Sequence, residues 1–146
     1  MTIDPSDIMR LMQGSPFNRL LGIQGECQGP GRVVMTLPAR DDVVGDPRRP
    51  ALHGGVVATL VDTAGGAAAW STLAPGESVS TMNLSVDYLE PAGLGAPLRA
   101  EAKLLRKGSR VCHVRVSVTQ GDVHVADGRG LYSIHRPRAP RGATRD

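Results

Sequence analysis

The apolar positions of this chain fall into one long stretch and a series of short alternating segments. Residues 51–73 are apolar on nearly every helical face and rich in alanine and glycine, which predicts a helix that other elements cover closely. The stretch also holds four glycines, one Asp and one His and has little side-chain bulk, which argues against a membrane span. After Gly76, apolar and polar residues alternate, as is typical of strands with one buried face.

This alternation predicts four consecutive strands joined by hairpins, with turn signals between them. In the first, Met82 is expected on the same face as Leu84, and in the last an irregularity is expected around Gly128 and Gly130. The four segments are 82–88, 98–104, 112–118 and 123–134.

The N-terminal part predicts a short capped helix over 4–14, which starts at Asp4-Pro5-Ser6-Asp7 and is closed by Gly14 and Pro16. Two strands are expected next, and a polar loop follows them. These three segments are 18–28, 31–37 and 38–50. One apolar helix with an antiparallel sheet predicts an α+β architecture in which the helix covers one face of the sheet. Residues 1–135 are expected to form this single domain, and residues 136–146 a flexible tail rich in Arg and Pro.

Charge changes this picture less than the composition suggests. The chain of 146 residues has a formal net charge of +3 and a pI near 9.3, which invites a nucleic-acid interpretation. The excess, however, lies in the four arginines of residues 136–146, and the remainder of the chain is neutral. Aromatic residues make up only 3%, too few for the base-stacking platforms of single-strand binders. We therefore expect no nucleic-acid partner.

Cysteine and histidine usage indicates neither a disulfide framework nor a metal site. Cys27 and Cys112 form no paired motif, and the four histidines show no ligand spacing. The N-terminal residues are acidic and lack an apolar signal core. We expect a cytoplasmic protein that binds no metal and no membrane.

Asp62 is the first candidate for chemistry, because it lies inside the apolar stretch. If other elements cover this helix, removing the Asp62 carboxylate from water costs on the order of several kcal/mol. Carboxylates in such surroundings often take part in chemistry. The alternative is that Asp62 occupies an exposed strip of the helix or accepts a hydrogen bond from a neighbouring strand.

The second candidate is the His53-Gly54-Gly55 sequence at the start of the same helix. The N–H groups of a first helical turn have no intrahelical partner and lie at the positive end of the helix dipole, which suits an anion or a developing oxyanion. A plain transition from loop to helix is the alternative.

The two candidates cannot serve one site from the same helix. His53 and Asp62 are nine residues apart, which places them about 180° around the helix and ~13 Å along its axis. Either they are unrelated, or Asp62 of one subunit meets the His53-Gly54 end of another. The second arrangement predicts an obligate dimer with active sites at its interface.

Three segments together resemble hotdog-fold acyl-CoA thioesterases of the phenylacetate-degradation (PaaI) type. They are L-H-G-G-V-V-A-T-L-V-D-T-A at 52–64, S-T-M-N-L-S-V-D-Y-L-E-P-A at 80–92 and R-K-G-S-R-V at 106–111. The resemblance runs from about Pro50 to Ser133. It implies the hotdog fold, a long helix wrapped by an antiparallel sheet, assembled as a homodimer and often as a dimer of dimers. It also implies hydrolysis of an acyl-CoA thioester, with coenzyme A as part of the substrate and no separate cofactor.

The same resemblance implies roles for individual residues. Asp62 would be the nucleophile or general base, and the Gly54 N–H would polarise the thioester carbonyl from the partner subunit. His53 would support that loop, and Gly55 would adjoin the substrate. Thr81 matches a Ser or Thr that lies near the catalytic acid in the family, although strict alternation would put Ser80 on the helix side.

Two further matches concern substrate binding. The family commonly has an Asn six residues before the histidine, where this chain has Pro47, and Asp46 is expected to take its place although it is an acid. A basic turn is expected near the phosphates of coenzyme A, with an ordinary solvated turn as the alternative. Its residues are Arg106, Lys107, Gly108 and Arg110.

Two other functions compete with hydrolysis. One is a non-catalytic acyl-CoA-binding or regulatory module with the same fold. The other, a hotdog hydratase, is disfavoured because the chain lacks a hydratase-type His/Asp pair. The sequence does not indicate whether the acyl group is aryl or alkyl.

Overall fold

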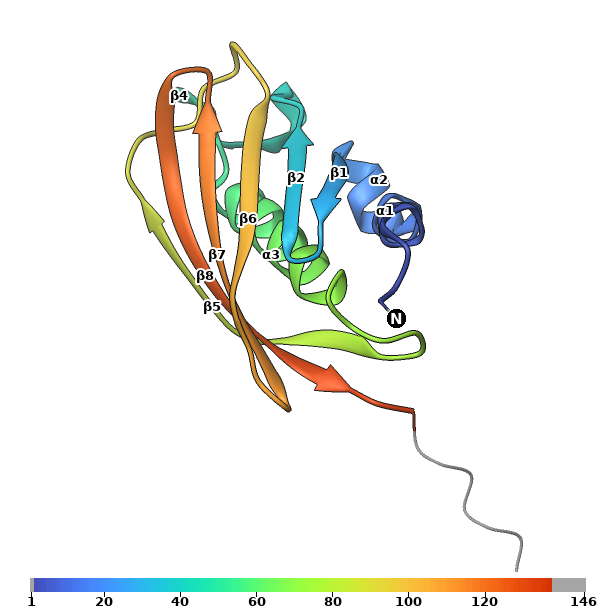
Figure 1. The fold of residues 1–146 in the computed structure, drawn as a ribbon. Helices are drawn as coiled ribbons and strands as arrows, with labels where there is room; N and C mark the ends of the chain where they lie inside the picture. The colour runs from blue at the N-terminus through green and yellow to red at the C-terminus, as the bar shows by residue number, and fades with distance from the viewer. Residues whose placement is uncertain (1, 138–146) are drawn as a thin grey trace, which may run out of the picture.

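The computed structural model describes residues 2–137 and consists of a six-stranded antiparallel sheet curved around one long helix (Figure 1). The order of the strands is β1-β2-β6-β7-β8-β5, and a separate hairpin is formed by β3 and β4. The helices are α1 (Pro5–Gly14), α2 (Pro16–Leu21), the 3-10 helix η1 (Asp41–Val43) and α3 (Gly54–Trp70). The strands are β1 (Gln24–Gly29), β2 (Arg32–Leu37), β3 (Val44–Asp46), β4 (Arg49–Leu52), β5 (Ser78–Tyr88), β6 (Leu98–Lys107), β7 (Val111–Gln120) and β8 (Val123–His135). The predicted hotdog architecture is confirmed.

Helix α3 forms the centre of the hydrophobic core. Nine of its residues are buried, and it contacts β2 and every strand from β5 to β8. Its small side chains let the concave face of the sheet approach closely, as the Ala- and Gly-rich stretch predicts. Among residues 2–137, no helix combines the length and the apolar character that crossing a membrane requires.

The N-terminal helix is confirmed, but the first predicted strand begins too early. Asp4 caps α1 by accepting a hydrogen bond from the Ser6 N–H. Residues 16–21, predicted in part as strand, form α2 instead. Pro16 at the first turn fits a helix start, and Gly22 ends the helix in the left-handed region at φ 73°. Only from Gln24 does the chain become extended.

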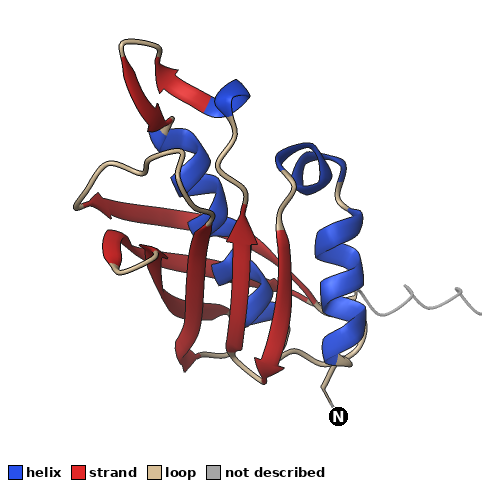
Figure 2. Cartoon of the chain, turned by 90° about the horizontal axis from the view of Figure 1, so that it is seen from above, coloured by secondary structure: helices blue, strands red, loops and turns tan. Residues whose placement is uncertain are grey.

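Residues 38–50, predicted as a loop, contain ordered structure. They include η1, β3 and the start of β4, and Figure 2 shows the β3–β4 hairpin beyond the start of α3. Gly45 packs against His53: a Cβ on Gly45 would lie 3.0 Å from the His53 Cα atom. The hairpin therefore fixes the chain as it enters α3.

The topology of the last four strands differs from the predicted succession of hairpins. Hairpins join β6, β7 and β8, but β5 pairs with β8 and not with β6. After β5 the chain crosses to the far side of this group, and β6 pairs with β2. Alternation marks a strand and its buried face but carries no information about its neighbours. As a result, β5 lies at the edge of the sheet.

Arg136, the first residue of the predicted tail, contacts the domain. It donates to the Glu77 carboxylate and to the Ser109 carbonyl oxygen. Residues 138–146, the remainder of the predicted tail, lie outside the described residues.

Gly128 and Gly130 interrupt no pairing, so the predicted irregularity there is wrong. Both glycines lie in regular register with β5 and β7. A Cβ on Gly128 would overlap the Val61 side chain of α3, and one on Gly130 would overlap the Tyr132 ring. These glycines allow the helix and the sheet to approach closely.

We expect Gly128→Ala to lower the free energy of unfolding by about 1–3 kcal/mol, the usual cost of overpacking. Urea denaturation measures this loss, and Gly14→Ala is the matched control because a Cβ there meets no atom within 4 Å. In a Val61→Ala background the added methyl group has room, so the loss should shrink. An equal loss in both backgrounds would contradict the overlap with Val61.

Candidate active site

Asp62 lies half-buried on the side of α3 that faces the start of β5. Its Oδ1 atom accepts a hydrogen bond from the Thr81 hydroxyl at 2.7 Å. Ser80, the alternative, lies with its hydroxyl 2.6 Å from Nε2 of His135. Within one chain, Asp62 therefore matches the second expectation for it, a partly exposed carboxylate that accepts a hydrogen bond from a neighbouring strand.

A β-bulge in β5 explains why Thr81 makes this contact. The register with β8 slips between Thr81 and Asn83, which makes Met82 the extra residue. Met82 is 59% exposed and does not share the inner face with Leu84, contrary to the prediction. Thr81 and Tyr88 are separated by an odd number of positions, so a regular strand would place them on opposite faces. The bulge lets both side chains reach α3.

A cavity of about 360 Å³ surrounds Asp62 and brings in residues that the sequence did not identify. The Tyr132 hydroxyl donates to the backbone oxygen of Asp62 at 3.1 Å. Burial, followed by the negative charge of Asp62, raises the pKa of Tyr132, so this hydroxyl stays protonated and remains a donor. Trp70 and residues of α1 complete the wall.

The first turn of α3 positions the backbone N–H of Gly54. Nδ1 of His53 accepts from the Gly55 N–H at 2.8 Å, so this nitrogen carries no proton and Gly55 has no N–H left for a substrate. Among residues 2–137, no acceptor is found for the Gly54 N–H. The Gly54 carbonyl oxygen accepts from the Tyr88 hydroxyl at 2.8 Å. Of the N–H groups of Gly54 and Gly55, that of Gly54 is the one left without an acceptor among the described residues, and it lies between the side chains of His53 and Tyr88.

The Asp62 and Gly54 regions form two separate cavities in the chain. The cavity at Gly54 measures about 290 Å³, includes Tyr88 and shares no lining residue with the cavity at Asp62. Gly54 and Asp62 are eight positions apart in the helix, which is ~12 Å along the axis. Within one chain, the Asp62 carboxylate and the Gly54 N–H therefore do not meet.

Asp46 lies in the β3–β4 hairpin, where its carboxylate is already engaged. Both of its oxygens accept from the Arg48 guanidinium, and the Arg48 backbone N–H donates to it as well. These hydrogen bonds lower the pKa of the Asp46 carboxyl. Within residues 2–137, no hydrogen bond joins the Asp46 side chain to the Gly54 turn.

The basic turn lies at the opposite end of α3 from Gly54. The Lys107 ammonium donates to the Thr72 carbonyl oxygen just beyond the helix C-terminus, and the Gly108 N–H closes the hairpin onto Val111. Arg106 and Arg110 are exposed. Within one chain, this turn meets neither half of the candidate site.

Comparisons with known proteins identify the family of the chain. The family model described as "Thioesterase superfamily" matches residues 50–126. The medium/long-chain acyl-CoA thioesterase YigI of Escherichia coli (strain K12) is 32% identical over 133 residues, covering 82% of this chain and 85% of its own. Acyl-coenzyme A thioesterase 13 of Homo sapiens is 28% identical, covering 88% and 90%.

The solved structure of the E. coli PaaI protein from the phenylacetic acid degradation operon has a TM-score of 0.76. At 23% identity over 88% of each chain, it supports the fold alone. The resemblance inferred from the sequence motifs is thereby confirmed at the level of fold and family. The chain belongs to the thioesterase superfamily, has its hotdog fold and is a thioester hydrolase.

Proposed function

We propose that this protein hydrolyses acyl-CoA thioesters to a free acid and coenzyme A. The activities that name the two relatives, YigI and acyl-coenzyme A thioesterase 13, support this substrate class. The observation that carries the site assignment is its division into halves, with Asp62 in one cavity and the Gly54 N–H in another. An active site that needs both groups requires two chains.

In the proposed dimer, the β5 edges of two copies pair antiparallel. One strand borders both halves of the site, since Thr81 near its start contacts Asp62 and Tyr88 at its end contacts Gly54. Antiparallel pairing about a two-fold axis brings the start of one β5 beside the end of the other. Asp62 of each chain then faces the Gly54 turn of its partner, and the dimer contains two equivalent sites.

The proposed chemistry uses one carboxylate and one oxyanion donor. As a general base, Asp62 takes a proton from water while the water oxygen bonds to the thioester carbon; as a nucleophile, its own oxygen forms that bond. The Gly54 N–H stabilises the negative charge on the carbonyl oxygen. The C–S bond then breaks and coenzyme A leaves as a thiolate, which in the general-base route takes up the proton held by Asp62. In the nucleophilic route, water then hydrolyses the acyl–Asp62 anhydride, which releases the free acid and restores the carboxylate. Neither route needs a metal or further cofactor. His53 keeps the donor turn in place.

A panel of aryl-, short-chain and long-chain acyl-CoAs tests the proposal, with released thiol measured by a colour reagent. We expect release from at least one class, and the preferred class identifies the acyl group. Binding of acyl-CoA without thiol release from any of them would favour the alternative, a non-catalytic acyl-CoA-binding module. In that case, Asp62 would have no chemical task.

We expect Thr81→Val to lower kcat about tenfold, because it removes one hydrogen bond to a charged group and leaves Asp62 less firmly oriented. Thr81→Ser keeps the hydroxyl and should retain most of the turnover. Steady-state kinetics separate the two variants, and KM should change little in either. A similar loss of kcat in both variants would indicate that the methyl group matters and that the hydrogen bond does not.

A further inference from the structure

A second cavity, larger than the one at Asp62, lies between the N-terminal segment and the loop that follows α3. It measures about 990 Å³. Most of its lining comes from residues 2–11, which lie outside the part of the chain that the family model matches, and the rest comes from the end of α3 and residues 75–78. The Ile3 N–H donates to the Leu73 carbonyl oxygen at 3.1 Å, which holds the N-terminal segment beside this loop (Figure 1).

Two side chains form the wall that this second cavity shares with the Asp62 cavity. Leu11 of α1 and Trp70 at the end of α3 line both cavities. The Trp70 indole N–H donates to the Glu77 carbonyl oxygen at 3.0 Å, so this ring is fixed. Leu11 is 54% exposed, and exposed side chains change rotamer within picoseconds to nanoseconds. The shared wall therefore has one fixed side and one movable side.

The lining of the second cavity favours an apolar occupant. Its surface is mainly apolar and comes from Ile3, Pro5, Leu11, Trp70 and Pro75. Its charged residues are already engaged within the chain. Asp4 accepts from the Ser6 N–H, Asp7 pairs with Arg10 at 3.2 Å, and Glu77 pairs with Arg136 at 2.9 Å. An occupant of this cavity therefore meets apolar surface in the main.

Given the proposed hydrolysis of acyl-CoA, on which this inference rests, we propose that the second cavity receives the far end of a straight acyl chain. The thioester lies at Asp62, and Leu11 and Trp70 determine which chain lengths reach the second cavity. Asp62 and Trp70 are eight positions apart, which is ~12 Å along α3. With a C–C bond of about 1.5 Å, an extended chain advances about 1.25 Å per carbon. The chain therefore reaches the shared wall at about ten carbons, and later carbons enter the second cavity.

The length of the chain then determines how much apolar surface is buried. Each methylene that enters the second cavity adds about 0.8 kcal/mol of burial, which corresponds to a roughly fourfold higher kcat/KM. A short or aryl acyl group ends in the Asp62 cavity and gains nothing from the second one. We therefore expect straight chains longer than about ten carbons to be preferred over aryl groups.

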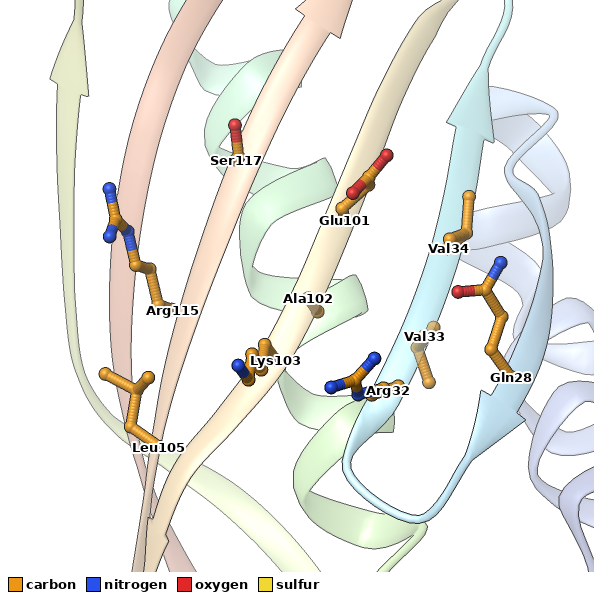
Figure 3. A pocket seen from close by; sticks show the side chains of 10 residues that line it. All are labelled: Gln28, Arg32, Val33, Val34, Glu101, Ala102, Lys103, Leu105, Arg115 and Ser117. Carbon is orange, nitrogen blue, oxygen red and sulfur yellow. The ribbon is translucent and has the colours of Figure 1, made fainter.

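The hollow on the other face of the sheet offers no such path. Figure 3 shows it on the face that points away from α3, among side chains that include Arg32, Lys103 and Arg115. Among residues 2–137, this hollow shares no lining residue with the Asp62 cavity. The sheet lies between the two, so a chain whose thioester is at Asp62 extends along α3 instead.

The fluorescence of Trp70, the sole tryptophan of the chain, reports where a bound acyl chain ends. Bromine quenches indole fluorescence on close contact, so ω-bromodecanoyl-CoA should quench Trp70 strongly and ω-bromohexanoyl-CoA weakly, both at saturation. Asp62→Asn is the protein to use, since it should bind these thioesters and hydrolyse them slowly. Decanoyl-CoA without bromine corrects for binding alone. Equal quenching by the two bromo-acyl groups, or quenching by neither, would overturn the proposal.

The preference for long chains tests the second cavity directly. The measured quantity is the ratio of kcat/KM for tetradecanoyl-CoA over octanoyl-CoA, which does not depend on the amount of folded protein. Leu11→Trp narrows the passage, and Ser78→Phe fills the second cavity, because Ser78 lines it and does not line the Asp62 cavity. Each variant should lower this ratio at least about tenfold, since two or more methylenes lose their burial.

The matched control is Leu20→Trp on α2, where the leucine is also exposed and lies outside both cavities. It should keep the wild-type ratio. An unchanged ratio in Ser78→Phe, in a protein that still hydrolyses octanoyl-CoA, would overturn the second cavity as the place of the chain end. If the wild type hydrolysed no acyl-CoA of any length, the proposed function itself would fail.

Discussion

Asp62→Asn is expected to lower kcat for a hydrolysable acyl-CoA by at least about 100-fold. Asparagine has the same shape and its amide oxygen can still accept from the Thr81 hydroxyl, so the local structure should persist. The amide cannot take a proton from water or form the first bond to the thioester carbon, and a lost general base costs roughly 100-fold to 10,000-fold. Steady-state release of coenzyme A thiol measures the effect.

The control for this variant is Asp122→Asn in the exposed β7–β8 turn, which removes an equal charge away from both cavities. Its turnover should equal that of the wild type. KM for Asp62→Asn should change far less than kcat, since the proposed role of the carboxylate is in the reaction and not in binding. Full turnover in Asp62→Asn would remove Asp62 from the mechanism.

The sequence identified the elements that have a strong local signal. The α3 stretch, the capped helix α1 and the buried faces of β6 and β7 each follow from a periodicity or a capping motif within a short window. Contacts that link distant parts of the chain have no such signal. For this reason, the pairing of β5 with β8 and the helix at Pro16–Leu21 were missed, although Pro16 and Gly22 marked the limits of that helix.

The site shows the same division between local and distant information. Asp62 and Gly54 stood out because their types are unusual for their positions, an acid in an apolar helix and a glycine at a helix start. Tyr132 and Tyr88 were missed, although the sequence holds only two tyrosines and each contacts one half of the site. The glycine at position 65 leaves room for Tyr132, since a Cβ there would overlap the Tyr132 hydroxyl.

The bulge at Met82 places Thr81, and not Ser80, against Asp62, whereas strict alternation favours Ser80. A strict period of two places Ser80 with Met82 and Leu84 on the side of the helix, yet Thr81 makes the contact with Asp62. One extra residue reverses the faces of everything before it, and an alternating pattern cannot reveal where a strand slips. The family match in the second motif carried that information in place of the pattern.

Gly54→Pro is expected to lower kcat by about 100-fold to 1,000-fold, the usual cost of one oxyanion donor. Proline has no N–H but fits the first position of a helix, and the extended backbone of His53, with ψ 134°, suits a residue that precedes proline. Gly54→Ala keeps the N–H, and its Cβ would lie 3.4 Å from the Tyr88 ring, an ordinary contact. The alanine variant should therefore lose much less. Equal losses in the two variants would show that the space at Gly54, and not its N–H, is what matters.

Mixing the two inactive proteins tests whether the site is shared between chains. In a dimer of one Asp62→Asn chain and one Gly54→Pro chain, one site combines both lesions and the other combines an intact Asp62 with an intact Gly54. Random exchange of subunits should therefore restore about a quarter of the wild-type activity. If Asp62 and Gly54 acted within one chain, every chain in the mixture would carry a lesion, and activity would stay at the level of the separate variants.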